Sequence, residues 1–245
     1  MSSNMKLAAI YNIWDSEELL IGSINQIREQ VDEVIIVYQE YSNFKEYNPN
    51  LLPLLSTIDA RLIKYTPDYV SGGTWNESVK RALGWKEAKR TGCTHFLFMD
   101  ADEYYNTNDF LNAKQDIIDN DYDGTACRLY TYYKSTAYRV DPIENYYVPF
   151  ICKIKEGQVI GGEWNVYCDP TRGISGVTNF YEFPQDKLMM HHLSYVRNDI
   201  GMKLRNSSAK ANFRNIEGMI QRFNNWTFGE FAINFEQYNI IECRS

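Results

Sequence analysis

Along the first third of the chain, hydrophobic positions recur with the periods of strands and helices in turn. The runs 6–14 and 33–38 are apolar enough for strands buried on both faces. Between them, apolar residues recur at helical spacing on a single face: Leu20, Ile24, Ile27 and Val31. A strand, a helix and a strand in this order predict a parallel pair with a right-handed crossover.

The alternation continues toward residue 100. A short helix near 50–56 and a strand at 61–65 come next. Thr74 and Glu77 then have the spacing of a capping box, which predicts a helix from there to about Arg90. These elements extend the parallel sheet and place helices on its faces.

Beyond residue 105 the pattern changes to alternating aromatic and polar positions. A helix at 107–119 precedes two such segments, 124–133 and 146–155, and a further strand is expected at 187–196. Alternation of this kind is typical of antiparallel strands with one solvated face. A carboxyl-terminal helix is predicted at 212–226.

Length and composition fit one globular domain. The chain has 245 residues, of which 44% are hydrophobic and 23% charged. We therefore predict a single α/β domain over residues 1–245. Its sheet is mostly parallel and flanked by helices in 1–105, and a smaller antiparallel part fills 106–245.

Charge and hydropathy exclude several function classes. The net charge is −7, so no basic surface is expected to neutralise a nucleic acid. No apolar run is long enough for a membrane span, and the amino terminus lacks the apolar core of a signal peptide. Five scattered cysteines without C-x-x-C spacing argue against zinc and against a disulfide framework. We expect a cytoplasmic protein with reduced thiols.

The most informative stretch is the apolar run 95–99, which ends in Asp100 and Asp102. Side chains at i and i+2 on a strand point the same way, so the two carboxylates should converge just beyond the strand's carboxyl end. Open α/β sheets bind their ligands at that edge. Two hard oxygen ligands there suit Mg²⁺ or Mn²⁺, whereas Tyr105 stands where a calcium loop of the EF-hand type requires glycine.

The order of these parts resembles a GT-A fold glycosyltransferase, close to family 2. The resemblance rests on the opening strand with its acidic helix start, the second strand, the glycine-led helix, and Phe-Leu-Phe-Met-Asp-Ala-Asp-Glu at 96–103. It spans roughly residues 1–105. In place of that family's aspartate pair at the end of the second strand, this chain has Gln39 and Glu40.

The resemblance implies a metal-dependent transfer of sugar from a nucleotide-diphospho-sugar, most simply a UDP-sugar, to a hydroxyl acceptor. Asp102 is expected to hold the metal, with Asp100 as a second ligand or a partner of the ribose. His192 is the candidate third ligand, because many enzymes of this fold return a histidine to the metal. A core histidine satisfied by a carbonyl is the alternative for His192.

The early loops are expected to bind the nucleotide. Tyr11 and Asn12 end the first strand, where Tyr11 can stack on the base. Gln39 can hydrogen-bond the edge of the base. Asn76 and Lys80 can reach the ribose or the phosphates, although a helix start there is structural by default.

An inverting transfer also needs a carboxylate that deprotonates the acceptor. Glu163 is the first candidate, since Gly161 and Gly162 permit close approach and Trp164 offers a platform for a sugar ring. Asp169 is the second candidate. A plain tight turn is the structural alternative for this segment.

Two other functions remain open from sequence. A sugar-phosphate nucleotidyltransferase uses a similar sheet and metal, but it usually carries a glycine-rich phosphate loop after the first strand, which residues 12–15 lack. A noncatalytic nucleotide- or carbohydrate-binding protein could retain the same scaffold. The sequence sets neither the sugar nor the acceptor.

Overall fold

The computed structural model describes residues 5–208, 210 and 213–243. The order of its elements is β1 (Leu7–Ile13), α1 (Glu17–Ile27), η1 (Arg28–Gln30), β2 (Glu33–Tyr38), α2 (Leu51–Leu55), β3 (Arg61–Lys64), α3 (Gly73–Arg90), β4 (His95–Met99), β5 (Glu103–Tyr105), α4 (Thr107–Asn120), β6 (Gly124–Tyr133), β7 (Ser135–Asp141), β8 (Tyr147–Lys153), η2 (Pro170–Arg172), β9 (Phe180–Glu182), β10 (Met189–Tyr195), α5 (Ile200–Asn206), α6 (Ile216–Asn225) and β11 (Asn239–Glu242).

Four parallel strands in the order β3-β2-β1-β4 form the first half of the sheet. Ile10 of β1 lies between Ile35 of β2 and Phe98 of β4. The predicted strand-helix-strand unit is therefore confirmed, and so is the fold class, an α/β sheet flanked by helices. Because β1, β2 and β4 run parallel, their carboxyl ends share one edge of the sheet.

The second half of the sheet continues from β4 through antiparallel neighbours. β8 pairs with β4 and with β6, and β6 is followed by β7 and β11. β10 lies parallel to β6 and antiparallel to β5. This last pairing matters for function, because it places His192 of β10 opposite Glu103, one residue beyond Asp102.

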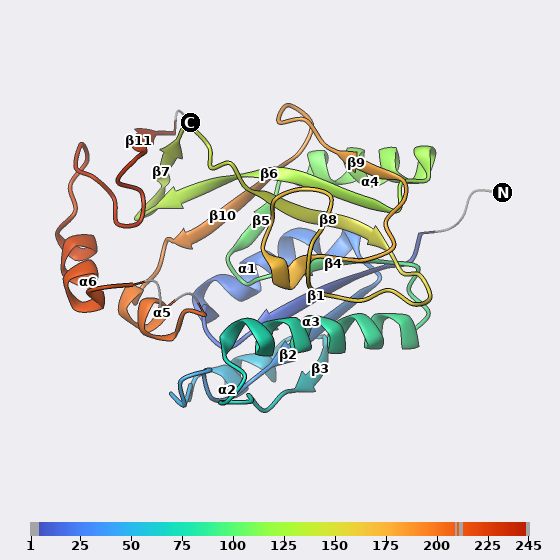
Figure 1. Ribbon diagram of the computed structural model, residues 1–245, viewed down its shortest axis with the longest axis horizontal. Helices are drawn as coiled ribbons and strands as arrows, with labels where there is room; N and C mark the ends of the chain where they lie inside the picture. Colours follow the sequence, from blue (N-terminus) through green and yellow to red (C-terminus); the bar gives the residue numbers. More distant parts are fainter. Residues whose placement is uncertain (1–4, 209, 211–212, 244–245) are drawn as a thin grey trace.

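Alternate residues of the buried strands pack into two different hydrophobic cores, one on each face of the sheet. Ala9 and Ile13 of β1 pack with α1 and α4 on one face of the sheet. Ala8 and Ile10 face the other side, where α3 contributes Trp85. Figure 1 shows α3 lying along the sheet beside β1 and β2. The layers are thus helices, sheet and helix, with both faces of β1 covered.

A third core lies at the end of the molecule where Figure 1 shows α5 and α6. Leu204 of α5, Phe223 of α6 and Tyr133 of β6 are buried there. Sequence reasoning predicted a helix over 212–226; residue 212 lies outside the described residues, and α6 begins at Ile216. Helix α5 and the strands β5, β7, β9 and β11 were not predicted, because each is short or lacks a regular apolar pattern.

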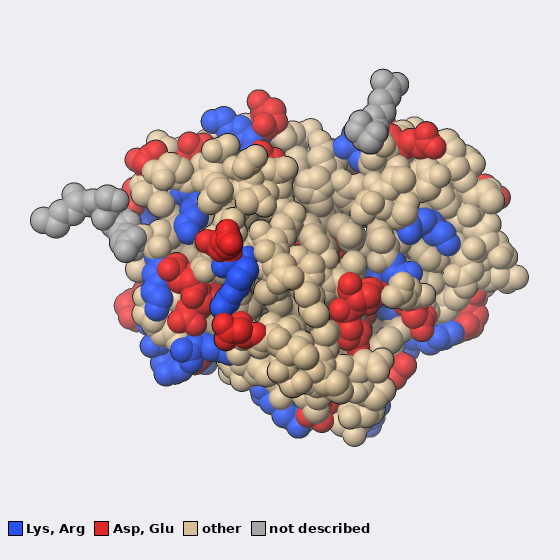
Figure 2. Space-filling view, turned by 180° about the vertical axis from the view of Figure 1, so that it is seen from behind, with Lys and Arg blue, Asp and Glu red and all other residues tan. Residues whose placement is uncertain are grey.

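Three expectations from composition can be compared with the structure. In the described residues, no helix is long and apolar enough to cross a membrane. All five cysteines are free thiols. On the face shown in Figure 2, acidic and basic side chains are interspersed around a largely uncharged centre, so no basic stripe is present on this face.

Candidate active site

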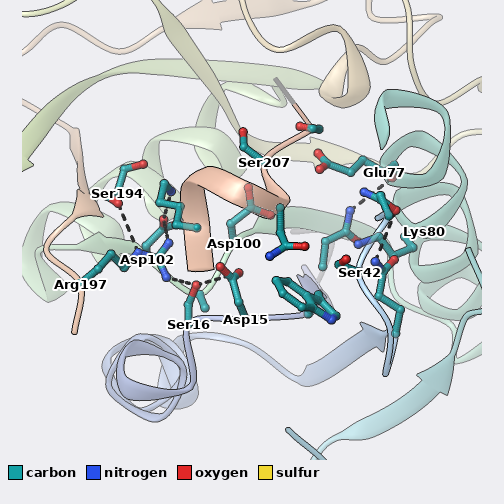
Figure 3. Close-up of a pocket in the computed structure, with 18 of the residues that line it drawn as sticks. Asp15, Ser16, Ser42, Glu77, Lys80, Asp100, Asp102, Ser194, Arg197 and Ser207 are labelled. Carbon is teal, nitrogen blue, oxygen red and sulfur yellow. Dashed lines mark hydrogen bonds and ion pairs between the residues drawn. The ribbon is translucent and has the colours of Figure 1, made fainter. Parts of the chain in front are cut away.

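A pocket of about 260 Å³ opens at the carboxyl edge of β1, β2 and β4. Figure 3 shows Asp100 near its middle, with Asp102 and Arg197 on one side and Glu77 and Lys80 on the other. The lining residues are Asn12, Trp14, Asp15, Ser16, Gln39, Ser42, Asn43, Glu77, Lys80, Asp100, Ala101, Asp102, Asp169, His192, Ser194, Arg197, Lys203, Asn206, Ser207 and Ser208.

Asp100 follows the last residue of β4 and is held by two arginines. Its Oδ1 lies 3.2 Å from Nη2 of Arg81, and its Oδ2 accepts a 2.6 Å hydrogen bond from Nη2 of Arg172. Burial alone would raise the pKa of this carboxyl, but the two guanidinium groups lower it to about 2. Asp100 is therefore ionised, and both of its oxygens already have cationic partners.

Asp102 is held by a separate pair of cations. Nη2 of Arg197 lies 2.5 Å from its Oδ2, and Nζ of Lys203 lies 3.4 Å from the same oxygen. Burial opposes ionisation, but Lys203 and Arg197 hold the pKa of Asp102 well below its usual range. Both predicted carboxylates thus line one pocket, as expected, but each is neutralised by different basic side chains.

His192 completes the surroundings of Asp102. Its Nε2 lies 3.8 Å from Oδ1 of Asp102, the carboxylate oxygen that faces away from Arg197. This separation is too long for a hydrogen bond. Burial lowers the pKa of His192 to about 4, so the imidazole is neutral at physiological pH and its nitrogen can act as a ligand.

The predicted metal site can be tested against these contacts. Within the described residues, no group of three or more His, Cys, Asp or Glu side chains is arranged to hold a metal ion. Asp102 and His192 do fit one, since two ligands of a small octahedral cation stand roughly 3 to 4 Å apart. Asp100 fits less well, because Arg81 and Arg172 occupy its oxygens. The donor set is thus one carboxylate and one imidazole.

Three of the residues predicted to bind the nucleotide line the pocket: Asn12, Gln39 and Lys80. Oδ1 of Asn12 and Oε1 of Gln39 are buried without a hydrogen-bond partner, and so is the indole nitrogen of Trp14 beside them. Buried polar atoms normally have partners. These three atoms are therefore unsatisfied polar groups of residues that line the pocket at the ends of β1 and β2.

Lys80 is a buried cation on α3 whose side chain reaches the same pocket. It is 4% exposed and forms no ion pair or hydrogen bond with another described residue. Burial lowers its pKa, which is the expected consequence of removing an ammonium group from water. An anionic ligand in the pocket would relieve this desolvation.

Two other residues that were predicted to bind the nucleotide lie outside the pocket. Tyr11 is fully buried in the core between β1 and α1, with its hydroxyl 3.0 Å from Oγ of Ser23, so it cannot stack on a base. Asn76 is also fully buried, and its amide is used by Tyr65 and Asp68. It organises the loop before α3 and does not line the pocket.

The predicted base Glu163 is exposed and lies outside the set of pocket-lining residues. The adjacent glycines have positive φ angles and form a tight turn, the structural alternative for this segment. Asp169, the second candidate, does line the pocket. Of the two carboxylates predicted as the base, only Asp169 therefore lies at the pocket.

Glu77 is a pocket residue that sequence reasoning placed in a capping box. Helix α3 begins at Gly73, one residue before Thr74, and no side chain caps it. Glu77 instead turns into the pocket, where burial raises its pKa. Arg81, one helical turn further on, also went unpredicted, although its i+4 spacing from Glu77 places both on one face.

Comparisons with known proteins give limited matches. No family model matches the sequence, and no curated protein matches it. Among solved structures, this chain is similar to S. aureus TarS 1-349, with a TM-score of 0.39, 19% identity, and 52% of this chain and 36% of that chain covered. For TarS 1-349 in complex with UDP-GlcNAc, the TM-score is 0.38, the identity 18% and the coverage 52% and 35%.

A mycobacterial protein is similar to a comparable extent. Its TM-score is 0.36 and its identity 13%, and the match covers 56% of this chain and 44% of that chain. In each of these comparisons, the likeness is one of fold and takes in less than half of the other chain.

Proposed function

We propose that this protein is a glycosyltransferase that moves a sugar from a nucleotide-diphospho-sugar to a hydroxyl acceptor. The observation that carries the proposal is the position of Asp100 and Asp102. They stand at the carboxyl end of a buried parallel strand, on the floor of a pocket that also contains basic side chains and unpaired polar groups. A ligand with a polar base, two phosphates and a sugar matches these three kinds of group.

The nucleoside end of the donor fits the side of the pocket formed by β1 and β2. Asn12 and Gln39 offer amide oxygens without partners, and Trp14 offers an indole N–H. Together they supply acceptors and a donor for the edge of a base. Tyr11, which was expected to stack on the base, is buried in the core and contributes nothing to this side of the pocket.

The diphosphate fits between Lys80 and Lys203, which stand on the two sides of the pocket. Lys80 forms no ion pair with a described residue, although Glu77 and Asp100 attract its charge across the pocket, and Nζ of Lys203 lies 3.4 Å from Oδ2 of Asp102. Both ammonium groups can bind phosphate oxygens as the leaving diphosphate gains charge. This would stabilise the transition state more than the bound donor, as catalysis requires.

A divalent cation is part of the proposal. Asp102 and His192 are the residues that would hold Mn²⁺ or Mg²⁺, and the ion would supply Lewis-acid stabilisation of the diphosphate. Ionised Asp102 and neutral His192 are both in the protonation states that a metal ligand needs. Asp100 keeps its arginine partners and is assigned to the ribose side.

Asp169 is the proposed general base for an inverting transfer. The bond between the anomeric carbon and the diphosphate oxygen breaks, and the diphosphate leaves with the electron pair. The acceptor oxygen forms the new bond to carbon and passes its proton to Asp169. The Asp169 side chain reaches the pocket from the second half of the chain, so it can stand on the acceptor side of the sugar.

The test is release of UDP from UDP-sugars in the presence of Mn²⁺, with simple glycosides as acceptors. TarS 1-349 is known in complex with UDP-GlcNAc, so this donor is the first to try, followed by UDP-glucose and UDP-galactose. We expect the wild type to turn over a UDP-sugar and Asp102→Asn to be inactive. Asp59→Asn, a control at an exposed position, should keep the wild-type activity. Binding without turnover would favour a noncatalytic protein, and dependence on pyrophosphate would favour a nucleotidyltransferase.

A further inference from the structure

The turn that carries Asp169 is tied to the rest of the site by its neighbours. Asp169 caps the short helix η2, accepting a 2.8 Å hydrogen bond from the backbone nitrogen of Thr171. The hydroxyl of Thr171 in turn accepts a 3.1 Å hydrogen bond from Nε of Arg81. Arg81 is fully buried on α3 and also pairs with Asp100. One side of the turn that carries Asp169 is therefore fixed to α3 and, through Arg81, to Asp100.

Arg172, the last residue of η2, fixes the other side. It donates a 2.6 Å hydrogen bond to Oδ2 of Asp100 and a 3.1 Å hydrogen bond to Oε2 of Glu103, and it also contacts the second oxygen of Glu103. The side chains of Arg172 and Glu103 are 5% and 3% exposed. Oε2 of Glu103 also accepts a hydrogen bond from the backbone nitrogen of Asp100. Arg172 is thus anchored to the turn that carries both aspartates.

Gly161 and Gly162, which precede η2 in the chain, hydrogen-bond to the backbone at both ends of η2. The backbone nitrogens of Gly161 and Gly162 donate to the carbonyls of Gly173 and Pro170, at 2.8 and 2.7 Å. A Cβ atom at Gly173 would stand 2.2 Å from the carbonyl oxygen of Gly162. Gly173 therefore allows the close backbone approach, and the two hydrogen bonds hold residues 161 and 162 against the turn that carries Asp169.

We propose that Arg172 is a positioning residue, which holds Asp169 at the acceptor side of the pocket by binding Asp100 and Glu103. The inference rests on the proposed function, since Asp169 is a base only if sugar transfer takes place. In this arrangement, the carboxylates of the donor site determine where the acceptor-side carboxylate stands. Arg172 does not touch the substrate; it acts through Asp169.

The test is a double-mutant cycle on Arg172→Met and Asp169→Asn, with UDP release from a UDP-sugar as the activity. We expect each single variant to lose about tenfold to a hundredfold in turnover. Because residues that act as a unit are not additive, the double variant should be within about threefold of Asp169→Asn alone. The Kd of UDP with Mn²⁺ should change less than about threefold, since Asp102, His192 and Lys203 are untouched and Arg81 still pairs with Asp100.

Arg172→Met leaves two buried carboxylates with fewer partners and could prevent folding. Thr171→Val therefore serves as a second, milder variant, since it removes only the contact with Arg81. It should lower turnover several-fold in the wild-type background and leave it unchanged in Asp169→Asn. Arg28→Met, which removes an exposed ion pair with Asp59, is the matched control and should behave as the wild type.

A structural readout separates the failure of this inference from the failure of the proposed function. Backbone hydrogen exchange over residues 161–176 should be faster in Arg172→Met and unchanged in Arg28→Met. Unchanged exchange in Arg172→Met, or losses of activity that simply multiply in the double variant, would overturn the anchoring role. If the wild type released no UDP from any UDP-sugar, the proposed function would fall and Asp169 would lose its assignment as base, while exchange would still decide whether Arg172 anchors the turn.

Discussion

The two halves of the molecule contribute opposite charges to the pocket. Residues 5–105 form the parallel strands and place Asp100 and Asp102 at the end of β4. Residues 106–243 form the antiparallel strands and bring most of the groups that bind these carboxylates: Arg172, His192, Arg197 and Lys203. There are exceptions on both sides: Lys80 and Arg81 are basic residues of α3 in the first half, and Asp169 is an acidic pocket residue of the second half.

The difference lies in how each half holds its residues in place. The aspartates follow a strand that is buried along its whole length, so the core of the sheet fixes their position. The cations arrive on short connections: Arg172 on η2, Arg197 just after β10 and Lys203 on α5. A buried charge without its partner is strongly destabilising. The pocket is therefore complete only when the second half packs against the first.

The largest expected effect comes from the first half, at Asp102. Asp102→Asn removes the candidate metal ligand and leaves Arg197 and Lys203 without their carboxylate. We expect UDP release to fall at least about a hundredfold. Asp100→Asn should lose less, on the order of tenfold, because its oxygens face arginines rather than His192. Steady-state kinetics of UDP release measure the loss of activity in each variant. Equal losses would contradict the distinction between the two aspartates.

The next effect comes from the second half, at Arg197. Its side chain is 4% exposed and contacts Asp102, which is 6% exposed. Arg197→Met should lower the free energy of unfolding by about 3 kcal/mol, because it breaks a buried ion pair. The matched control is Arg205→Met, whose pair with Glu217 is exposed, and we expect less than about 1 kcal/mol there. Urea denaturation of both variants decides whether the cations of this half also stabilise the fold.

The pH dependence of stability tests the packing of β4, the strand that ends at the aspartates. Burial lowers the pKa of His95, at the start of β4, to about 4. Between pH 4 and 6.5, the unfolded chain then binds more protons than the folded one, so stability falls as the pH is lowered through this window. His95→Asn removes this titration, so between pH 6.5 and pH 4 the variant should lose about 3 kcal/mol less stability than the wild type. Denaturation curves above pH 6.5 should show no pH-dependent difference between the two proteins. If the free energy of unfolding fell equally steeply with pH in both proteins below pH 6.5, the prediction would be contradicted.

The smallest expected effect concerns the packing of α3 on β1. A Cβ atom at Gly84 would stand 2.2 Å from Cγ2 of Ile10. Gly84→Ala should therefore destabilise the protein by about 1–2 kcal/mol despite the better helix propensity of alanine. Lys86→Ala, at an exposed position of the same helix, should stay within about 0.5 kcal/mol of the wild type. A stabilised Gly84→Ala would show that the first half is less tightly packed than described.

The first half could be predicted from sequence because its signals are local. The apolar run before Asp100 gave both the strand and the position of the aspartates, and the helical stripe of α1 gave the parallel crossover. Tyr11 was misplaced because both faces of β1 are apolar, so alternation alone does not say which face meets the pocket. Asn12, the polar residue beside it, was the better guide.

The charge partners in the second half had no such signal. Arg172 binds Glu103 across 69 positions of sequence, and Arg197 binds Asp102 across 95. No local pattern connects residues so far apart, and arginines in loops usually lie on solvated surfaces. His192 was predicted only because the resemblance to GT-A enzymes implies a histidine ligand in the later part of the chain. Sequence therefore predicted the carboxylates of the site, and the structure was needed to find what holds them.

The central claim, a donor site that needs both halves, is tested most directly by calorimetric titration of UDP with Mn²⁺ or with a chelator. The wild type should bind UDP, more tightly by at least about tenfold with Mn²⁺, and both Asp102→Asn and His192→Ala should lose that gain. UDP binding that is the same with Mn²⁺ and with chelator, or that both variants leave unchanged, would contradict the account.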